Sequence, residues 1–489
     1  KERLGDLCKL DNTGNFWTNW QLWRSDVFNC LSWMLALGLI LGSVYTLVAD
    51  LVREDKRGTL NFIRLSPQSA PKIFVGKLLG VPILVYLAAV LMLPLHMGFG
   101  WSVGATVPLL VSWYATIGAT WFLFASTAIL YVLLGGVQAI VTTIGTGFLL
   151  WLPLLITNAY LRGTVDRADW LTKDSNRSVN QIVWFGLPMN SSAIWIYAFG
   201  ICSCAIASYW VWQAIERRYL NPTATAIGKQ QSYLINFCLQ FWVAGFTLPL
   251  IFADPTQYFT TRQTLTIFAC VDFTALGLSI FLLLPSKQAV QDWSRHRRER
   301  TNGGRKFWQR DLVRDLLVND KSPVLLPIAI NVGIAMAVWL PVSLLANIKI
   351  PKLSMAFDEL SKPGIELKLA ATVCIAAALM LIYATIAHLA LFLKVQKRNV
   401  WTIAIIGGAT IFPLVCAGVL SPGRPPTGVA ALVLLFSPFA PFGVFKLGIG
   451  TILTAILVQL GVFATLTRQL QRQLQISGRS QSQELLARG

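Results

Sequence analysis

Residues 28–49 read FNCLSWMLALGLILGSVYTLVA, and residues 50–67 continue as DLVREDKRGTLNFIRLSP. The first stretch holds 22 residues without a charged side chain, which is enough for an α-helix to cross the ~30 Å hydrocarbon core of a bilayer. The second stretch is rich in charged residues and follows the first without a gap. We therefore expect a membrane helix that runs directly into a charged segment outside the membrane.

The whole chain repeats this contrast between apolar and charged segments. Its 489 residues are 55% hydrophobic and only 13% charged, with a mean hydropathy of +0.59. Soluble domains are about 45–50% apolar and about 25% charged. This composition excludes the disordered, collagen-like and disulfide-rich classes, and it predicts an all-α polytopic membrane protein.

Apolar stretches of membrane-spanning length are the main organising feature of the chain. We expect about eleven transmembrane helices. They are placed at 28–49, 76–97, 107–133, 138–157, 193–213, 233–252, 264–284, 323–345, 367–393, 400–420 and 446–466. A further apolar piece, 429–441, contains Pro438 and Pro441, so we expect a re-entrant or interfacial segment there.

Basic residues outnumber acidic ones by 41 to 22, which gives a net charge of +19. Most of the excess falls in segments on one side of the predicted spans: 53–72, 217–229, 295–314, 394–398 and 468–479. Lys and Arg collect in cytoplasmic loops of membrane proteins, so this side, with the C-terminus, is predicted to be cytoplasmic. The same reasoning excludes nucleic acid as a partner. It also predicts that the basic run at 293–314 contacts anionic membrane lipids.

Two halves of the chain share features that predict a pseudo-repeat. Each has a basic segment leading through Ser-Pro toward a span, at 66–67 and 322–323, and a Pro-interrupted apolar piece, at 184–188 and 435–439. We predict a first transmembrane half at 1–218 and a second at 219–489, with a basic loop at 285–322 and a tail at 467–489. Because one span precedes the first Ser-Pro and two precede the second, twelve spans are expected, one of them before Lys1.

The segment after the first span is predicted to fold as a short hairpin. Gly58-Thr59 permits a break and an N-cap for a short amphipathic helix, which Ser66-Pro67 ends. Leu60, Ile63 and Leu65 form the apolar stripe of that helix. An apolar stripe that projects from the bilayer must be covered by lipid headgroups or by a partner protein.

The pattern Glu54-x-x-x-Gly58-Thr59-Leu60, followed by Ser66-Pro67 and by Gly76-Lys77 before the next span, resembles the coupling loop of type-2 ABC export permeases. The sequence from Gly58 to Ala70 is similar to that of cyanobacterial members in particular, although Asn61 stands where the family commonly has an acidic residue. The resemblance implies both transmembrane halves in one chain, a bacterial inner membrane (plasma or thylakoid), and docking of the hairpin on a separate ATP-binding subunit. The docking residues would be Glu54, Arg57, Gly58, Thr59, Leu60, Ile63, Leu65, Ser66 and Pro67.

The second half offers a weaker version of this loop. Leu312 and Leu316 before Ser322-Pro323 keep the apolar spacing but lack Gly-Thr. The chain has no G-x-x-x-x-G-K-[ST] phosphate loop, so we expect no enzymatic activity and no cofactor in this chain by itself. ATP and magnesium would be bound by the ATP-binding partner.

Asp272 is a carboxylate deep in an apolar run. Charge inside a membrane is costly, so a functional role in a substrate path is one interpretation. A hydrogen bond between helices, or a protonated acid, is the other. Asn331, Gln459 and His388 are predicted to make interhelical hydrogen bonds, and His96 is expected near the outer interface.

Three functions compete on this sequence. The leading hypothesis is the membrane subunit of an ABC exporter. An ion-coupled secondary transporter that uses Asp272 explains the repeat and the buried acid, but not the hairpin pattern. A non-transporting scaffold subunit of a larger membrane complex is the third, because the second-half motif is weak.

Overall fold

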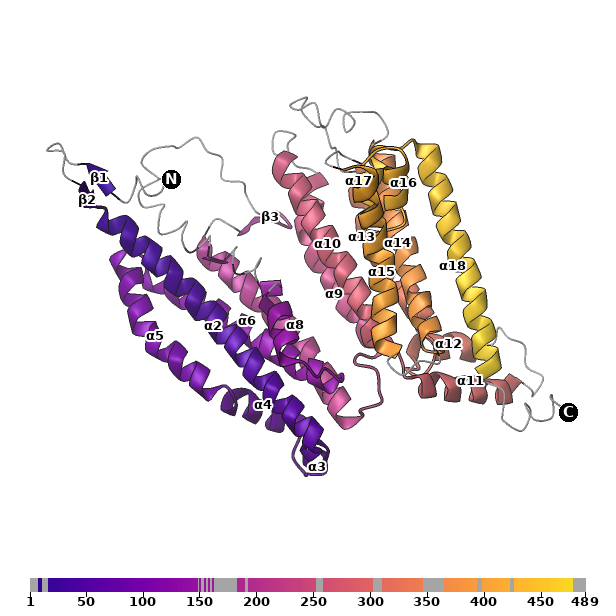
Figure 1. Ribbon diagram of the computed structural model, residues 1–489, viewed down its shortest axis with the longest axis horizontal. Helices are drawn as coiled ribbons and strands as arrows, with labels where there is room; N and C mark the ends of the chain where they lie inside the picture. Colours follow the sequence, from indigo (N-terminus) through magenta and orange to yellow (C-terminus); the bar gives the residue numbers. More distant parts are fainter. Residues whose placement is uncertain are drawn as a thin grey trace. The chain divides into compact units, whose positions relative to one another are not determined.

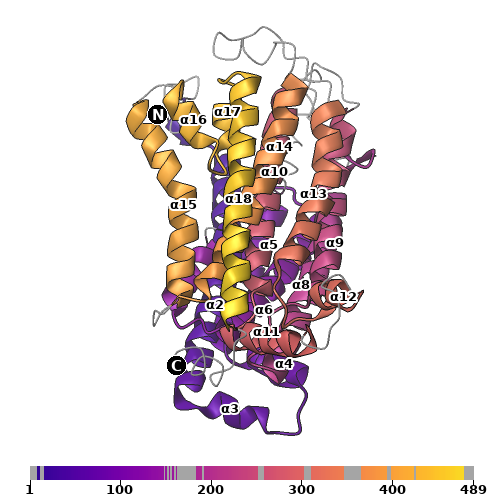
Figure 2. The ribbon, with the colours of Figure 1, turned by 90° about the vertical axis from the view of Figure 1, so that its right-hand side faces the viewer.

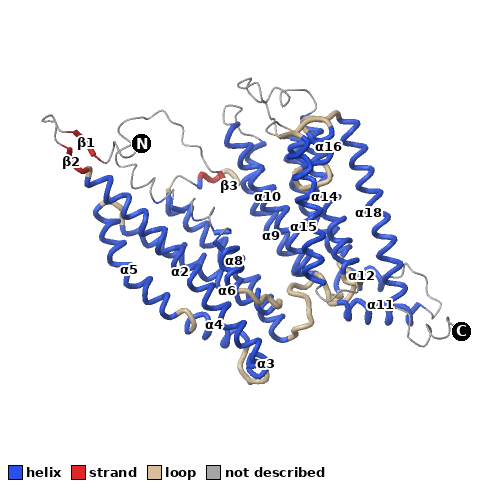
Figure 3. Tube along the Cα trace, viewed as in Figure 1, coloured by secondary structure: helices blue, strands red, loops and turns tan. Residues whose placement is uncertain are grey.

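The computed structural model describes residues 8–10, 16–147, 149–150, 154, 157–158, 161, 183–189, 192–251, 258–301, 310–345, 365–393, 398–422 and 426–477. Almost all of these residues are helical, and the strands are short pairs (Figure 3). The chain divides into two compact units. Unit 1 comprises Lys1–Ile182 with Pro188–Pro222, and unit 2 comprises Val183–Leu187 with Thr223–Gly489.

Unit 1 is a helical bundle built around one long helix (Figure 1). Its helices are α2 (Trp20–Arg57), α3 (Thr59–Arg64), α4 (Ala70–Gly80), α5 (Ile83–Ser102), α6 (Val107–Leu133) and α8 (Ala193–Leu220). Strand β1 (Cys8–Leu10) pairs antiparallel with β2 (Phe16–Thr18) before α2 begins. Helix α2 packs against α5 and α6, and α6 packs along α8.

Unit 2 centres on α14, which packs against α10, α13, α15, α17 and α18. Its helices are α9 (Lys229–Thr247), continued by the 3-10 turn η2 (Leu248–Ile251), α10 (Tyr258–Leu283), α11 (Lys287–Thr301), α12 (Arg310–Val318), α13 (Leu325–Leu345), α14 (Ile365–Ala390), α15 (Arg398–Leu420), α16 (Val429–Leu434), α17 (Ala440–Val444) and α18 (Ile449–Ser477). Helices α11 and α12 lie at the end of this bundle opposite α16 and α17 (Figure 2).

The described residues include seven helices that are long and apolar enough to cross a membrane: α2, α5, α6, α8, α13, α14 and α18. An eighth is added if Ala269–Leu283 and Lys287–His296, which meet at 67°, form one broken span. The protein is therefore an all-α, multi-pass integral membrane protein. The eleven predicted spans are not all confirmed, and 138–157 falls partly outside the described residues.

The two Pro-interrupted segments that suggested a repeat fold differently. As predicted, 429–441 is not one span, because α16 and α17 flank a turn in which Ser437 Oγ donates to Leu434 O (2.9 Å). In the first segment, β3 (Val183–Trp184) and β4 (Leu187–Pro188) form a tight turn with positive φ at Phe185 and Gly186. The turn joins α9 through Phe185 N–H, which donates to Gly245 O (2.8 Å). These segments do not support the predicted repeat.

Candidate functional site

Helix α2 extends well beyond the length needed to cross a bilayer. At 1.5 Å per residue, its 38 residues span about 57 Å, against a hydrocarbon core of ~30 Å. The apolar stretch ends at Ala49, so the last two turns carry the charge, including the exposed side chains of Arg53, Lys56 and Arg57. Helix α3 lies beyond this end of α2 (Figure 1). Unit 1 therefore has a projecting, basic end.

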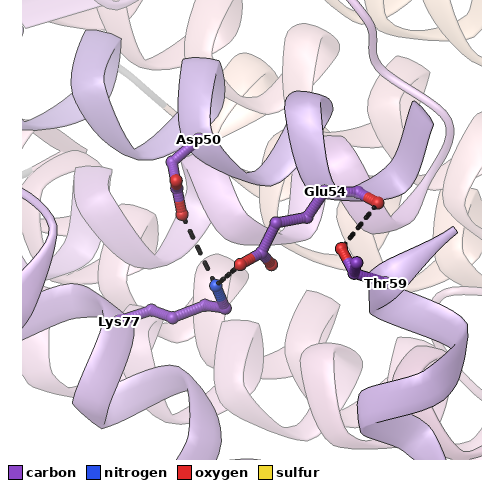
Figure 4. Close-up of polar contacts among 4 residues, drawn as sticks. All are labelled: Asp50, Glu54, Thr59 and Lys77. Atoms are coloured by element: carbon purple, nitrogen blue, oxygen red, sulfur yellow. Dashed lines mark hydrogen bonds and ion pairs between the residues drawn. The ribbon is translucent and has the colours of Figure 1, made fainter. Parts of the chain in front are cut away.

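Gly58 makes the turn from α2 into α3. Its φ of +75° is left-handed, and its N–H donates to Asp55 O (3.0 Å), which closes α2. Glycine adopts this conformation without the steric cost that a Cβ brings, so the predicted break at Gly58 is confirmed. The N-cap predicted at Gly58-Thr59 is also present, and it is formed by the Gly58 backbone without a side-chain hydrogen bond. The Thr59 hydroxyl donates back to Glu54 O (3.1 Å) at the end of α2 (Figure 4).

Lys77 of α4 closes the hairpin against α2. Its Nζ lies 2.5 Å from Glu54 Oε1 and 3.4 Å from Asp50 Oδ2 (Figure 4). The side chains of Lys77 and Glu54 are only 14% and 24% exposed, so this charge pair is largely shielded. Glu54, which the family pattern assigns to docking, thus holds the hairpin together within this chain.

The predicted apolar stripe of α3 is divided between two faces. Leu60 is buried at 2% exposure and Ile63 is half-buried, whereas Leu65 is 83% exposed. Phe62, which sequence reasoning did not single out, is 77% exposed. We call Phe62 and Leu65 the hairpin tip. Leu60 anchors the hairpin, and the tip is left uncovered.

Helix α8 braces the other side of the hairpin. The Phe74 ring of α4 meets the Tyr219 ring edge-on at 5.2 Å, and the Arg64 guanidinium lies 5.7 Å from the centre of the same Tyr219 ring. Arg64 also donates to Asn61 Oδ1 (2.9 Å). Next to Tyr219, Arg218 donates to Leu133 O at the end of α6 (3.2 Å). The hairpin is therefore fixed to the bundle of unit 1.

The second-half loop is held by a buried lysine. Lys229 is 1% exposed, and its Nζ donates to Leu316 O (2.8 Å), Ser322 Oγ (2.5 Å) and Pro323 O (3.2 Å). Ser322 is fully buried and Pro323 is buried. Both side chains are therefore covered within this chain, and their weaker docking role stays a prediction. The side chain of Leu312 lies outside the described residues.

Lys229 and its surroundings tie α12 to the start of α9. Tyr233 donates to Leu317 O (3.1 Å), and the Lys229 N–H donates to Asp320 Oδ1 (3.3 Å). Lys229 precedes the predicted span 233–252, and burial lowers its pKa to about 8, opposed by Asp320 and Asp315. Among the described side chains of α12, the exposed apolar ones are Val313 (48%) and Val318 (44%), and both are less exposed than Phe62 and Leu65.

Asp272 lies in unit 2 among α9, α10 and α13. It is 5% exposed, and it accepts hydrogen bonds from Gln240 Nε2 and from Trp339 Nε1 (2.9 Å). Sequence reasoning named neither partner. The sequence does contain a signal for these partners: polar residues recur at helical spacing on α9, at Ser232, Asn236 and Gln240. This spacing predicts a polar face on α9, and that face is the one that contacts Asp272.

The other buried polar residues mostly fill the predicted structural roles. Asn331 Nδ2 donates to Ser232 Oγ (3.2 Å), Gln459 donates to Leu435 O (2.8 Å), and His388 Nε2 accepts from Val324 N–H (3.1 Å). These contacts between segments are confirmed.

His96 lies in the last two turns of α5, and its interfacial depth stays a prediction, but its side chain is not exposed. His96 is fully buried, with Nε2 2.8 Å from Ser32 Oγ and Nδ1 2.7 Å from Tyr114 OH. Its ring also stacks on Trp113 at a centroid distance of 5.0 Å. Ser32 on α2 and Tyr114 on α6 supply the polar partners that permit this burial.

No protein-family model, no characterised protein and no solved structure matches this chain. Within the described residues, no group of three or more His, Cys, Asp or Glu side chains could hold a metal ion. Fold and contacts together define a multi-pass helical membrane protein with a braced, charged hairpin at one end of unit 1.

Proposed function

We propose that this chain is the membrane-spanning permease subunit of an ABC exporter, and that a separate subunit binds and hydrolyses ATP with Mg²⁺. The Gly58-Thr59-Leu60 pattern, followed by Ser66-Pro67 and Gly76-Lys77, supports this function through its resemblance to type-2 export permeases. The proposal includes two transmembrane halves with eleven spans in this chain, and a basic, cytoplasmic end in a bacterial inner membrane.

The single observation that carries the proposal is the uncovered hairpin tip. Phe62 and Leu65 are 77% and 83% exposed although both are large and apolar. The eight residues from Asp50 to Arg57 add about 12 Å beyond the apolar part of α2. For a helix near the membrane normal, this carries the tip past the headgroup layer, which adds only about 5–7 Å per side. A protein partner suits such a tip better than lipid does.

The braced hairpin suits a mechanical role. Helix α2 is continuous from Trp20 to Arg57, so movement that the hairpin passes to its charged end reaches the membrane along one unbroken helix. The Lys77 contacts with Glu54 and Asp50 keep α4 moving with α2. The packing of Phe74 on Tyr219 extends the motion to α8. In this proposal, ATP-driven closure of the partner moves these helices and exposes the substrate path to the other side.

A pair of aspartate substitutions tests the proposal. Leu65→Asp places a charge on the tip, whereas Gln68→Asp places the same charge on an exposed polar side chain three residues away. The full-length protein is purified in mild detergent from its native membrane, and the co-purifying ATPase activity is measured. We expect Leu65→Asp to lower this activity at least about tenfold, which corresponds to a loss of about 1.4 kcal/mol in association, and Gln68→Asp to leave it unchanged.

Unchanged ATPase recovery with Leu65→Asp, and also with the double variant Phe62→Asp/Leu65→Asp, would contradict the proposal. Since both side chains are largely exposed, neither substitution should change the thermal unfolding of the protein. Thermal unfolding therefore separates a lost contact from a lost fold.

A further inference from the structure

A file of polar side chains runs through the apolar interior of unit 2. Lys229, Ser232, Asn236 and Gln240 follow one another on α9 at intervals of three, four and four residues, which places them on one helix face. All four are buried, at 1%, 2%, 6% and 2% exposure. We call Ser232, Asn236 and Gln240 the polar stripe.

The polar stripe leads from the basic end of unit 2 to Asp272. Ser232 Oγ donates to Lys229 O (2.7 Å) and accepts from Asn331 Nδ2 (3.2 Å). Asn236 Nδ2 donates to Asn331 O (2.7 Å). Gln240 Nε2 contacts Asn236 Oδ1 (3.5 Å) and donates to Asp272 Oδ1. Polar contacts are thus continuous along α9 as far as the carboxylate.

Two helices independently give the depth of Asp272. Gln240 lies eleven residues after Lys229, which is about 16 Å along α9 from the basic end. Asp272 lies eleven residues before Leu283, where α10 reaches the same basic end, again about 16 Å. Half of a ~30 Å hydrocarbon core is ~15 Å, so the carboxylate lies near the middle of the membrane.

The described neighbours of Asp272 do not neutralise its charge. Its two hydrogen-bond donors, Gln240 and Trp339, are both neutral. On the helices packed around it, the described charged side chains are Lys229 on α9 and Glu366 and Lys368 on α14, each near a helix end, and α13 carries none.

Two further titratable groups on these helices have hydrogen-bond partners other than Asp272. His388 of α14 bonds Ala384 O (2.9 Å) and accepts from Val324 N–H. Tyr233 of α9 is occupied with Leu317 O. A carboxylate in hydrocarbon without a cationic partner is costly, and binding a proton removes that cost.

Gln240 is suited to both charge states of such a group. As placed, its Nε2 donates to the carboxylate, while its Oε1 is buried and has no partner among the described residues. A half-turn of the amide exchanges the two atoms, and Oε1 then accepts from the O–H of a carboxylic acid. Asn331 Oδ1 is a second buried oxygen without a described partner on the way to the basic end.

We propose that Asp272 is a reversible proton-binding site in the middle of unit 2, reached along the polar stripe and served in both states by Gln240. The step is simple protonation: a proton from the aqueous phase at the basic end joins a carboxylate oxygen, and no other bond changes. The proposal goes beyond the ABC exporter function and does not depend on it, because it concerns contacts within unit 2 only.

Infrared spectroscopy of the full-length protein in lipid nanodiscs tests this site. Spectra are recorded over a pH series for the wild type, for Asp272→Asn and for Asp292→Asn, which alters an exposed carboxylate on α11. We expect a carboxylic-acid C=O band that is present at mildly acidic pH, disappears reversibly as the pH rises, and is missing only from Asp272→Asn. A wild-type spectrum that matches that of Asp272→Asn at every pH would overturn the proposal, as would a band that responds to Na⁺ and not to pH.

A second measurement keeps the proposal testable if Asp272→Asn does not fold. Trp339 donates directly to Asp272, so its environment reports the charge there. In protein labelled with 5-fluorotryptophan, the ¹⁹F resonance assigned through Trp339→Phe should titrate with pH. In Gln240→Leu, which removes a donor to the charged form, the midpoint should move to higher pH by about one unit. A Trp339 resonance that ignores pH in both proteins would overturn the proposal.

Discussion

The two Ser-Pro loops of this protein use the same dipeptide in opposite ways. In unit 1, Ser66 is half-buried and Pro67 is exposed beside an uncovered tip. In unit 2, Ser322 and Pro323 are buried around the Lys229 ammonium. The dipeptide follows a short helix in both loops, and it precedes the short helix α4 in unit 1 and the long apolar helix α13 in unit 2. Its surroundings decide whether the loop faces outward.

The comparison also separates two ways of holding a loop. The first hairpin is closed by an ion pair between side chains, Lys77 with Glu54, and its apolar tip stays free. The second is closed by a side chain on backbone carbonyls, Lys229 with Leu316 O and Pro323 O. The first design leaves a surface for another protein, and the second uses its polar groups internally.

Removing Lys229 should have the largest effect on stability, and it should disrupt the second loop without affecting the first. Lys229→Met leaves Leu316 O and Pro323 O without their donor, so we expect a loss of about 3–4 kcal/mol in the free energy of unfolding. Hydrogen exchange should speed up across 310–322 and stay unchanged across 58–67. Lys321→Met, at an exposed neighbour, is the control. Equal effects from the two substitutions would show that Lys229 does not hold this loop.

Two leucines of the first hairpin should separate the anchor from the tip. Leu60→Ala removes a buried side chain, and we expect it to cost about 2–3 kcal/mol, whereas Leu65→Ala at 83% exposure should cost less than about 0.5 kcal/mol. Thermal unfolding in detergent compares them directly. Equal destabilisation by both would mean that Leu65 is covered within this chain.

Exchanging the charges of the ion pair should sharpen the contrast between the loops. Glu54→Lys or Lys77→Glu places like charges about 2.5 Å apart, and each should destabilise unit 1 by about 1–3 kcal/mol. The double variant restores opposite charges and should recover at least half of that loss in a double-mutant cycle. If the double variant is as unstable as the sum of the singles, the pair does not close the hairpin.

Two glycines of the first hairpin should give the smallest effects, with opposite signs. A Cβ meets nothing within 4 Å at either Gly58 or Gly76, so only the backbone differs. Gly58→Ala must adopt φ +75° and should cost about 1 kcal/mol. Gly76→Ala, inside α4, should stabilise the protein by about 0.5–1 kcal/mol. Urea titration of the unfolding transition compares the two, and effects of the same sign would contradict the left-handed turn.

Local signals in the sequence were enough to predict the helical class and the break at Gly58, because apolar runs and glycine act over a few residues. The burial of Leu60 and the exposure of Leu65 could not be predicted, because a helix of six residues is too short to show a reliable apolar period. The role of Lys229 was missed for another reason. Its acceptors lie 87 and 94 residues along the chain, and a lysine before a span otherwise indicates only orientation.

Covalent capture at the hairpin tip tests the central claim most directly. The photoreactive residue p-benzoylphenylalanine replaces Phe62 in the full-length protein in its native membrane, and it replaces Trp101, 78% exposed at the far end of α5, as the control. After irradiation, mass spectrometry identifies the adducts. We predict that position 62 captures a subunit with a phosphate-binding loop and ATPase activity, and that position 101 does not. Adducts with lipid alone at position 62, or the same adducts at both positions, would contradict the account.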